Sequence, residues 1–133
     1  FEIPLGLLNR LVTTGGRIDV KKGGIFQIVH GIRSLALEAG LEETGTLPRL
    51  RRLAEAGTLD RRTAADLEAA FTTLLGLRLR HRVDQLRRGE TPDDRLDPSD
   101  FGRLERDALR DSLLVAKHFR EILRHRYQLG LMT

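Results

Sequence analysis

Two lysines followed by two glycines form the short motif in this sequence that is best suited to bind an anion. Lys21, Lys22, Gly23 and Gly24 stand directly before a segment whose apolar residues recur with helical spacing. The N–H groups and positive dipole end of a helix N-terminus attract anions, and glycines let an anion approach closely. The motif is therefore a candidate phosphate-binding turn. Since similar strings also occur in ordinary turns, a plain turn is the alternative.

A second cation lies within the segment that follows. At about 100° per residue, Arg33 projects inside the apolar arc that contains Ile28 and Ile32, whereas Gly31 projects onto the polar face. A guanidinium in such an arc needs either a carboxylate partner or a pocket that receives an anion. The sequence leaves both readings open.

A third group of cations continues the apolar stripe of another predicted helix. The stripe contains Leu67 and Leu74, and the same sector then carries Arg78, His81 and Arg82. Either these polar groups line a pocket, or the helix extends beyond the core and its end is solvated. Apolar residues on one flank favour the pocket, because they indicate that contact with the core continues there; they are Leu79, Val83 and Leu86.

Metal binding is not predicted. The four aspartates at positions 93, 94, 97 and 100 carry oxygen ligands suited to Mg²⁺, but an acidic loop that caps a helix is the simpler account. His118 and His125 are seven residues apart, so they cannot chelate one ion as an i, i+4 pair can. We expect both histidines at a surface or an interface.

The familiar catalytic motifs are missing from the sequence. It has no cysteine, no Gly-x-Ser-x-Gly elbow, no Walker lysine loop and no His-Glu-x-x-His zinc motif. No catalytic residue is therefore predicted.

The composition favours packed amphipathic helices in one domain. Of 133 residues, 40% are hydrophobic, 32% are charged and only 5% are aromatic. The net charge is +4, but opposite charges alternate along the predicted helices, which is typical of a solvated surface and disfavours nucleic-acid binding. No apolar run approaches the roughly 20 residues that span a bilayer. Together with the lack of cysteine, this leads us to expect a cytoplasmic protein.

Four main helices must position these groups. They are predicted over residues 24–40, 46–57, 60–88 and about 97–128, with a short apolar helical segment at 4–12 and a loop at 90–97. Glycines follow three of the helices as expected for C-terminal caps. The fold class is thus an all-α, up-and-down bundle of four main helices with additional short helices. The single domain spans 1–133, and because it opens on Phe1 we expect it to be a fragment of a longer protein.

Four stretches of the sequence carry a family resemblance: IDVKKGGIFQIVHGIRSLALEAG, TGTLPRLRRLAEAGTLD, DLEAAFTTLLGLRLRHRVDQLRRGETPDD and RLERDALRDSL. In this order and spacing, the chain resembles the nucleotidyltransferase substrate-binding domain family. The resemblance implies a helical module at the C-terminal end of multidomain bacterial signalling proteins. An upstream nucleotidyltransferase domain is then expected, related to the protein-PII uridylyltransferase and the glutamine-synthetase adenylyltransferase. CBS pairs and a cyclic-nucleotide-binding domain often precede that domain.

The resemblance also carries over to individual residues. Lys21, Gly23, Gly24 and Arg33 match the first motif of the family, and a second motif is matched by Arg78 and His81. Two positions depart from the pattern. Arg82 stands where the family tends to have glutamine, and Asp94 stands where it tends to have asparagine.

The implied function is substrate binding next to a separate catalytic domain. The sequence lacks the Gly-Ser turn and paired carboxylates that hold Mg²⁺ and a nucleoside triphosphate in such transferases. The metal and the nucleotide are therefore expected in the catalytic partner, and no cofactor is expected in this domain. A protein acceptor and a second copy of the domain are further candidate partners. The alternative is a regulatory interaction or dimerisation module that binds no ligand. Because Arg33 and Arg78 each interrupt the inward face of a predicted helix, they are expected to approach the same cavity or share a carboxylate.

Overall fold

The computed structural model describes residues 16–132, with side chains through residue 128. The apolar segment expected at 4–12 lies outside this range. Four α-helices dominate the described part: α2 (Phe26–Glu38), α3 (Thr46–Glu55), α4 (Arg61–Arg87) and α5 (Arg103–Met132). The short elements are β1 (Ile18–Asp19), the π-helical turn η1 (Lys21–Ile25), β2 (Arg95–Leu96) and the 3-10 turn η2 (Pro98–Asp100). The predicted all-α class is confirmed.

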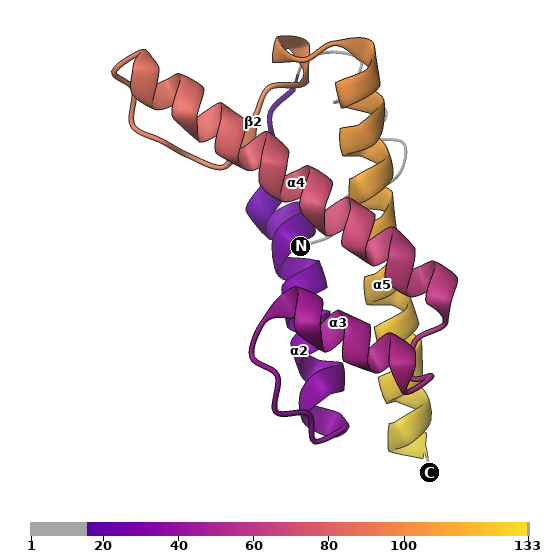
Figure 1. Ribbon diagram of the computed structural model, residues 1–133. Helices are drawn as coiled ribbons and strands as arrows, with labels where there is room; N and C mark the ends of the chain where they lie inside the picture. Colours follow the sequence, from indigo (N-terminus) through magenta and orange to yellow (C-terminus); the bar gives the residue numbers. More distant parts are fainter. Residues whose placement is uncertain (1–15, 133) are drawn as a thin grey trace.

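The long helices pack side by side in alternating directions. In Figure 1, α2 and α5 run the same way, and α4 crosses them in the opposite direction. The short helix α3 lies against α2 and the first half of α4. The last turns of α4 project from the body, accompanied by the loop that returns to β2 (Figure 1). This projecting half carries most of the polar groups singled out above.

The helix boundaries follow the capping signals in the sequence. Asp60 caps α4, because its carboxylate accepts the Thr63 N–H at 2.7 Å. Three glycines that follow helices have the positive φ that glycine adopts readily: Gly40 (+70°), Gly57 (+76°) and Gly89 (+73°). Gly45 is the N-cap of α3, and no side chain caps this helix.

The last helix begins later than expected and continues through Gly130. The carboxylate of Asp97 accepts the Ser99 N–H at 3.0 Å and starts η2, not α5. Phe101 is extended after this turn, so the chain changes direction before α5 begins. Asp97 therefore caps a 3-10 turn, and its expected position at the start of the last long helix is wrong.

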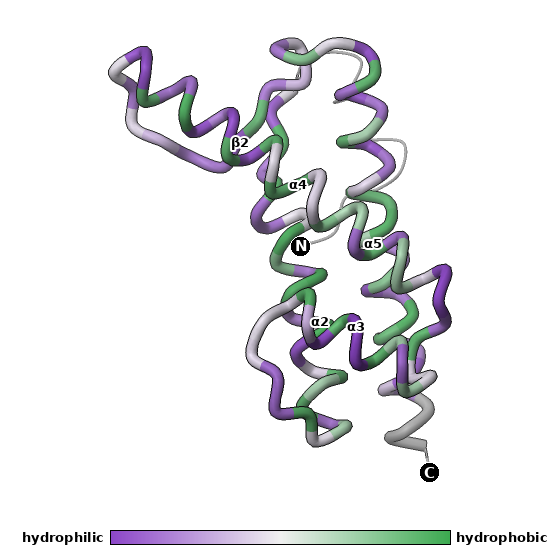
Figure 2. Tube along the Cα trace, in the orientation of Figure 1, coloured by the Kyte–Doolittle hydropathy of each residue, from purple (hydrophilic) through white to green (hydrophobic). Residues whose placement is uncertain are grey.

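The core lies between the four helices. Hydrophobic and hydrophilic residues alternate along each helix in Figure 2, and the fully buried side chains come from all four. The largest of them on the helices are Ile28, Ile32 and Leu35 of α2, Leu50 and Leu53 of α3, Leu67 and Leu74 of α4, and Leu109 and Phe119 of α5, and Ile18 of β1 and Leu96 of β2 are buried with them. In the described part, no helix has the length and apolar character needed to cross a membrane.

The buried face of α2 is rotated from its predicted position. Gly31 is buried, whereas Arg33 is exposed, so the predictions for both residues are wrong. The reason is the close approach of α5: a Cβ at position 31 would lie 2.4 Å from Phe119 Cε2 and 2.6 Å from Leu123 Cδ1. A projection based on hydrophobicity treats glycine as neutral, and it therefore overlooks a contact that glycine alone permits.

Candidate functional site

Two arginines of α4 share one carboxylate from the following loop. Arg78 donates from Nε to Asp94 Oδ1 at 2.5 Å, and Arg82 donates from Nη1 to the same oxygen at 3.1 Å. The Asp94 side chain is 17% exposed, while Arg78 and Arg82 are 31% and 36% exposed. We call these three residues the Asp94 cluster. Its carboxylate therefore lies deeper than the two guanidinium groups that it holds.

The charge of Asp94 is stabilised in the folded state. Partial burial alone would raise the pKa of its carboxyl, but the hydrogen bonds and charges of Arg78 and Arg82 outweigh this effect. The pKa of Asp94 is consequently below its usual range, and the cluster remains an ion pair at neutral pH. Arg82 and Asp94, the two positions expected from the sequence to depart from the family pattern, are thus direct partners.

A second set of hydrogen bonds holds the same loop against α4. His81 Nε2 lies 3.0 Å from Asp93 Oδ1, and the Gln85 side chain accepts the Asp93 N–H at 2.8 Å. His81 and Gln85 are both buried. The hydrogen bond from His81 lowers the pKa of Asp93, burial opposes this, and the Arg95 N–H lowers it further. The loop is therefore attached through two successive aspartates.

The lysine-glycine turn lies next to this loop. β1 pairs with β2 in antiparallel register, Ile18 opposite Leu96, and the Val20 N–H donates to the Asp94 carbonyl at 3.0 Å. The turn η1 follows immediately and packs against α4. Lys21 and Lys22 are exposed beside the loop. The hydrogen bond thus brings the backbone just before Lys21 to the Asp94 carbonyl, and no ion pair joins Lys21 or Lys22 to the Asp94 cluster within residues 16–132.

The second glycine of the turn, Gly24, has a packing role in the structure. Gly24 is buried, and a Cβ there would lie 2.8 Å from Leu74 Cδ1 and 3.0 Å from Leu113 Cδ2. Asp19 already accepts the Lys22 N–H at 2.9 Å. One amide of the predicted cradle is thus occupied by the chain itself, and the lysine side chains remain as its accessible cations.

Arg33 lies apart from this group. It is exposed on α2, and its side chain has no hydrogen bond or ion pair within residues 16–132. Arg78 shares a carboxylate with Arg82 instead, so the expected sharing between Arg33 and Arg78 is wrong. The helix projection that placed Arg33 inward also produced this error.

The polar end of α4 lines a pocket, which was one of the two arrangements expected from the sequence, but of the three predicted residues His81 lines it and Arg78 and Arg82 do not. Arg78, His81 and Arg82 are largely covered by the loop that follows the helix, and the acidic partners Asp93 and Asp94 were missed. The sequence did contain a signal for this pairing. The inward sector of the helix carries three basic residues, and two successive aspartates follow soon after the helix ends. The apolar flank was also misjudged, because Leu79 and Leu86 are 65% and 61% exposed.

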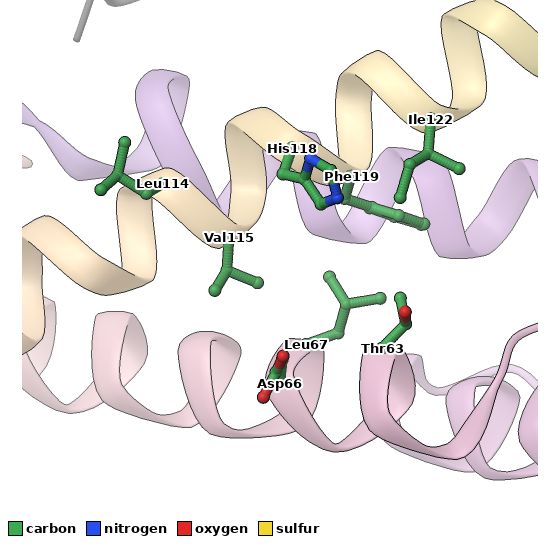
Figure 3. Close-up of a pocket in the computed structure, with 8 residues that line it drawn as sticks. All are labelled: Thr63, Asp66, Leu67, Leu114, Val115, His118, Phe119 and Ile122. Atoms are coloured by element: carbon green, nitrogen blue, oxygen red, sulfur yellow. The ribbon is translucent and has the colours of Figure 1, made fainter.

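Two of the hollows along these helices border residues discussed above. A polar pocket of about 210 Å³ is lined in part by His81. An apolar groove of about 220 Å³ lies between the first half of α4 and α5, and Leu67, Val115 and Phe119 point toward it in Figure 3. His118 lies at the groove (Figure 3), and both His118 and His125 are exposed, which confirms their predicted surface position. Within residues 16–132, no three potential metal ligands gather.

Comparison with protein families gives one match that covers nearly the whole chain. The family model described as "Putative nucleotidyltransferase substrate binding domain" matches residues 1–127. Comparisons with curated proteins and with solved structures found no match. The matched range contains every residue of the Asp94 cluster and of the lysine-glycine turn. The chain belongs to the family of nucleotidyltransferase substrate-binding domains.

Proposed function

We propose that the Asp94 cluster, with Lys21 and Lys22, binds the anionic part of a nucleotidyltransferase substrate. The anion is either the phosphate chain of a nucleotide or an acidic group of the acceptor. The observation that carries this proposal is the sharing of one recessed carboxylate by two partly exposed arginines. Two guanidinium charges face a single carboxylate charge, so the cluster keeps an excess of positive charge.

The donor geometry supports anion binding. A guanidinium has five N–H donors, and Arg78 uses Nε while Arg82 uses Nη1 toward Asp94. The remaining donors are available to a phosphate or carboxylate. Because Asp94 already restricts both side chains, a ligand loses less of its binding free energy to ordering them. Phosphate oxygens suit such paired, planar donors well.

The chemical step belongs to another domain in this proposal. A nucleotidyltransferase catalytic domain in the same longer chain would bind the nucleoside triphosphate and Mg²⁺, which supplies charge stabilisation at the transferred phosphate. We further infer a cytoplasmic bacterial signalling protein whose catalytic domain is related to the PII uridylyltransferase and the glutamine-synthetase adenylyltransferase. The resemblance of the sequence motifs supports this finer assignment, including upstream CBS and cyclic-nucleotide-binding domains.

Calorimetric titration with tripolyphosphate tests the anion site, because this probe carries phosphates without base or sugar. We expect a dissociation constant on the order of 1 mM, rising with salt as ionic contacts are screened. Arg78→Gln and Lys21→Ala should each weaken binding several-fold. Arg110→Gln is a matched control, since Arg110 is 35% exposed and pairs with aspartates on α5. Equal binding by all four proteins, or no binding by any, would contradict the proposal.

A regulatory interaction or dimerisation module is the second candidate function. Three leucines on one side of α4 support it: Leu75, Leu79 and Leu86, exposed by 37%, 65% and 61%. Light scattering across a concentration series distinguishes the two functions. A dimer that Leu79→Ser dissociates, combined with no response to tripolyphosphate, would favour this second candidate.

A further inference from the structure

The polar pocket beside His81 is lined by other residues than those of the Asp94 cluster. The pocket is lined by Arg80, His81 and Asp84 of α4, by Arg88 directly after it, and by Asp100 and Phe101 of the following segment. His81 belongs to both regions, because its ring contacts Asp93 of the loop and the residue also lines the pocket. The question is which groups of the pocket remain available to a ligand.

The contact between His81 and Asp93 defines the tautomer of the imidazole. Asp93 Oδ1 also accepts the Arg95 N–H at 3.0 Å, and its carboxylate is ionised at neutral pH. An ionised carboxylate only accepts hydrogen bonds, so Nε2 of His81 carries a proton and donates to Asp93. In the neutral form of the ring, Nδ1 of His81 is then a hydrogen-bond acceptor.

This acceptor opens into the pocket. His81 is only 7% exposed, and no residue in the described range bonds to its Nδ1. Among residues 16–132, the fully buried side-chain polar atom without a hydrogen-bond partner is Glu43 Oε2. Nδ1 of His81 also has no partner, so it is not fully buried. Nδ1 is thus accessible to solvent, and the pocket is the hollow that His81 lines.

The other acceptors of the pocket are two carboxylates. Asp84 and Asp100 make no side-chain hydrogen bond within residues 16–132. The hydrogen bonds of the two arginines go to other residues: Arg80 pairs with Glu105, and Arg88 pairs with Glu90 at 2.9 Å, while the charge of Arg88 also interacts with Asp84 and Asp100. The pocket consequently favours a ligand that donates hydrogen bonds over an anion.

Arg80 adds a flat surface to the pocket wall. Its guanidinium lies over the ring of Phe101, 5.1 Å from the ring centroid, and Phe101 is buried. A guanidinium held in this way can stack with an aromatic base on its other face. Hydrogen-bond acceptors beside a stacking surface match a sugar joined to a base.

We propose that this pocket binds the nucleoside part of the substrate, with ribose hydroxyls donating to His81 Nδ1 and Asp84 while the base stacks on Arg80. This inference rests on the proposed function, since a nucleotidyltransferase substrate carries a ribose. Carboxylates commonly accept hydrogen bonds from ribose hydroxyls in nucleotide sites. Neutral imidazole nitrogen can accept in the same way.

Uridine and 2′,3′-dideoxyuridine test the pocket, because both carry the same base and neither carries phosphate. In a nuclear magnetic resonance titration of the full chain, uridine should shift the signals of His81, Asp84 and Phe101. The dideoxy compound should bind about tenfold more weakly, as expected when hydrogen bonds to buried acceptors are lost. Equal binding of both compounds, or shifts confined to other residues, would overturn the proposal.

Two variants sharpen the test. His81→Gln preserves a donor to Asp93 but lacks Nδ1, and Asp84→Asn changes a carboxylate that no hydrogen bond holds. Each should reduce the preference for uridine over its dideoxy analogue to less than about threefold. If His81→Gln fails to fold, Asp84→Asn decides alone, and an unchanged preference in a folded variant contradicts the assignment.

Tripolyphosphate separates this inference from the proposed function. If uridine binds as described and tripolyphosphate does not bind, the nucleoside pocket stands and the anion site at the Asp94 cluster fails. If tripolyphosphate binds and uridine leaves the pocket signals unchanged, the anion site stands and the nucleoside pocket is refuted.

Discussion

At the scale of single residues, Gly31 carries the tightest constraint on the packing of α2. Replacing it with alanine places a methyl group 2.4 Å from Phe119 and 2.6 Å from Leu123. Because both neighbours are core side chains, we expect Gly31→Ala to lower the free energy of unfolding by about 1–3 kcal/mol. Thermal and urea unfolding monitored by circular dichroism measure the change.

Gly76 is the matched control for this prediction. It lies inside α4, and no atom lies within 4 Å of a Cβ built there. Gly76→Ala should therefore raise the stability by up to about 1 kcal/mol through helix propensity alone. If both variants unfold like the parent protein, α2 and α5 do not pack as closely as described.

A second prediction at this scale concerns the ion pair between Arg82 and Asp94. Asp94→Asn and Arg82→Gln each disrupt a shared, partly buried interaction, so each should destabilise the protein by about 0.5–2 kcal/mol. The double variant has neutral side chains at both positions, so its loss of unfolding free energy should be smaller than the sum of the losses in the two single variants. A double-mutant cycle should give a coupling free energy of about 0.5–1 kcal/mol. Strictly additive effects would show that the two side chains do not interact.

At the scale of secondary-structure elements, the loop between α4 and β2 depends on ionised aspartates. The folded pKa values of Asp93 and Asp94 are both below the ordinary aspartate value of 3.8. Their stabilisation is therefore complete above about pH 4 and is lost as the pH falls through the folded pKa values. We expect this loop to detach from α4 in acid while the core helices remain folded.

Nuclear magnetic resonance between pH 7 and pH 2.5 measures this transition. The amide signals of Val20 and Arg95 report on it, because their N–H groups donate to Asp94 and Asp93. Both should move toward unfolded positions only below about pH 4. An Asp93→Asn, Asp94→Asn double variant lacks both charges, so its signals should show no such step. Identical profiles for parent and variant would contradict the role of the carboxylates.

The elements themselves were largely predictable, because local signals determine them. Asp60 and the glycines at 40, 57 and 89 mark helix ends, and the stripe containing Leu67 and Leu74 correctly predicts the inward face of α4. The face that α2 buries was not predictable in the same way. Its orientation depends on a close approach of α5 at Gly31, which a hydrophobicity pattern does not record.

The candidate site was only partly predictable for a related reason. Arg78, His81 and Arg82 were identified by residue types that interrupt an apolar stripe, but their partners come from a loop distant in sequence by 12 to 16 residues. The sequence alone does not specify the path of such a loop. The pairing of β1 with β2, which brings Lys21 and Lys22 beside it, is also a long-range contact between two-residue strands.

At the scale of the whole molecule, the account predicts binding without catalysis. Within residues 16–132, no three potential metal ligands gather, and the sequence has no Gly-Ser turn with paired carboxylates. Incubation of the domain with labelled ATP, UTP or CTP, Mg²⁺ and a protein acceptor should therefore give no transfer above background. Metal-dependent labelling by the purified domain would refute this prediction.

The most direct test of the central claim observes the Nε–H signals of Arg78 and Arg82 while tripolyphosphate is added to the protein. The account predicts that both signals shift together and saturate in the millimolar range, while the signal of Arg110, equally exposed on α5, stays in place. The shifts should diminish at high salt. Unmoved Arg78 and Arg82 signals at saturating tripolyphosphate, or equal shifts at Arg110, would contradict an anion site at the Asp94 cluster.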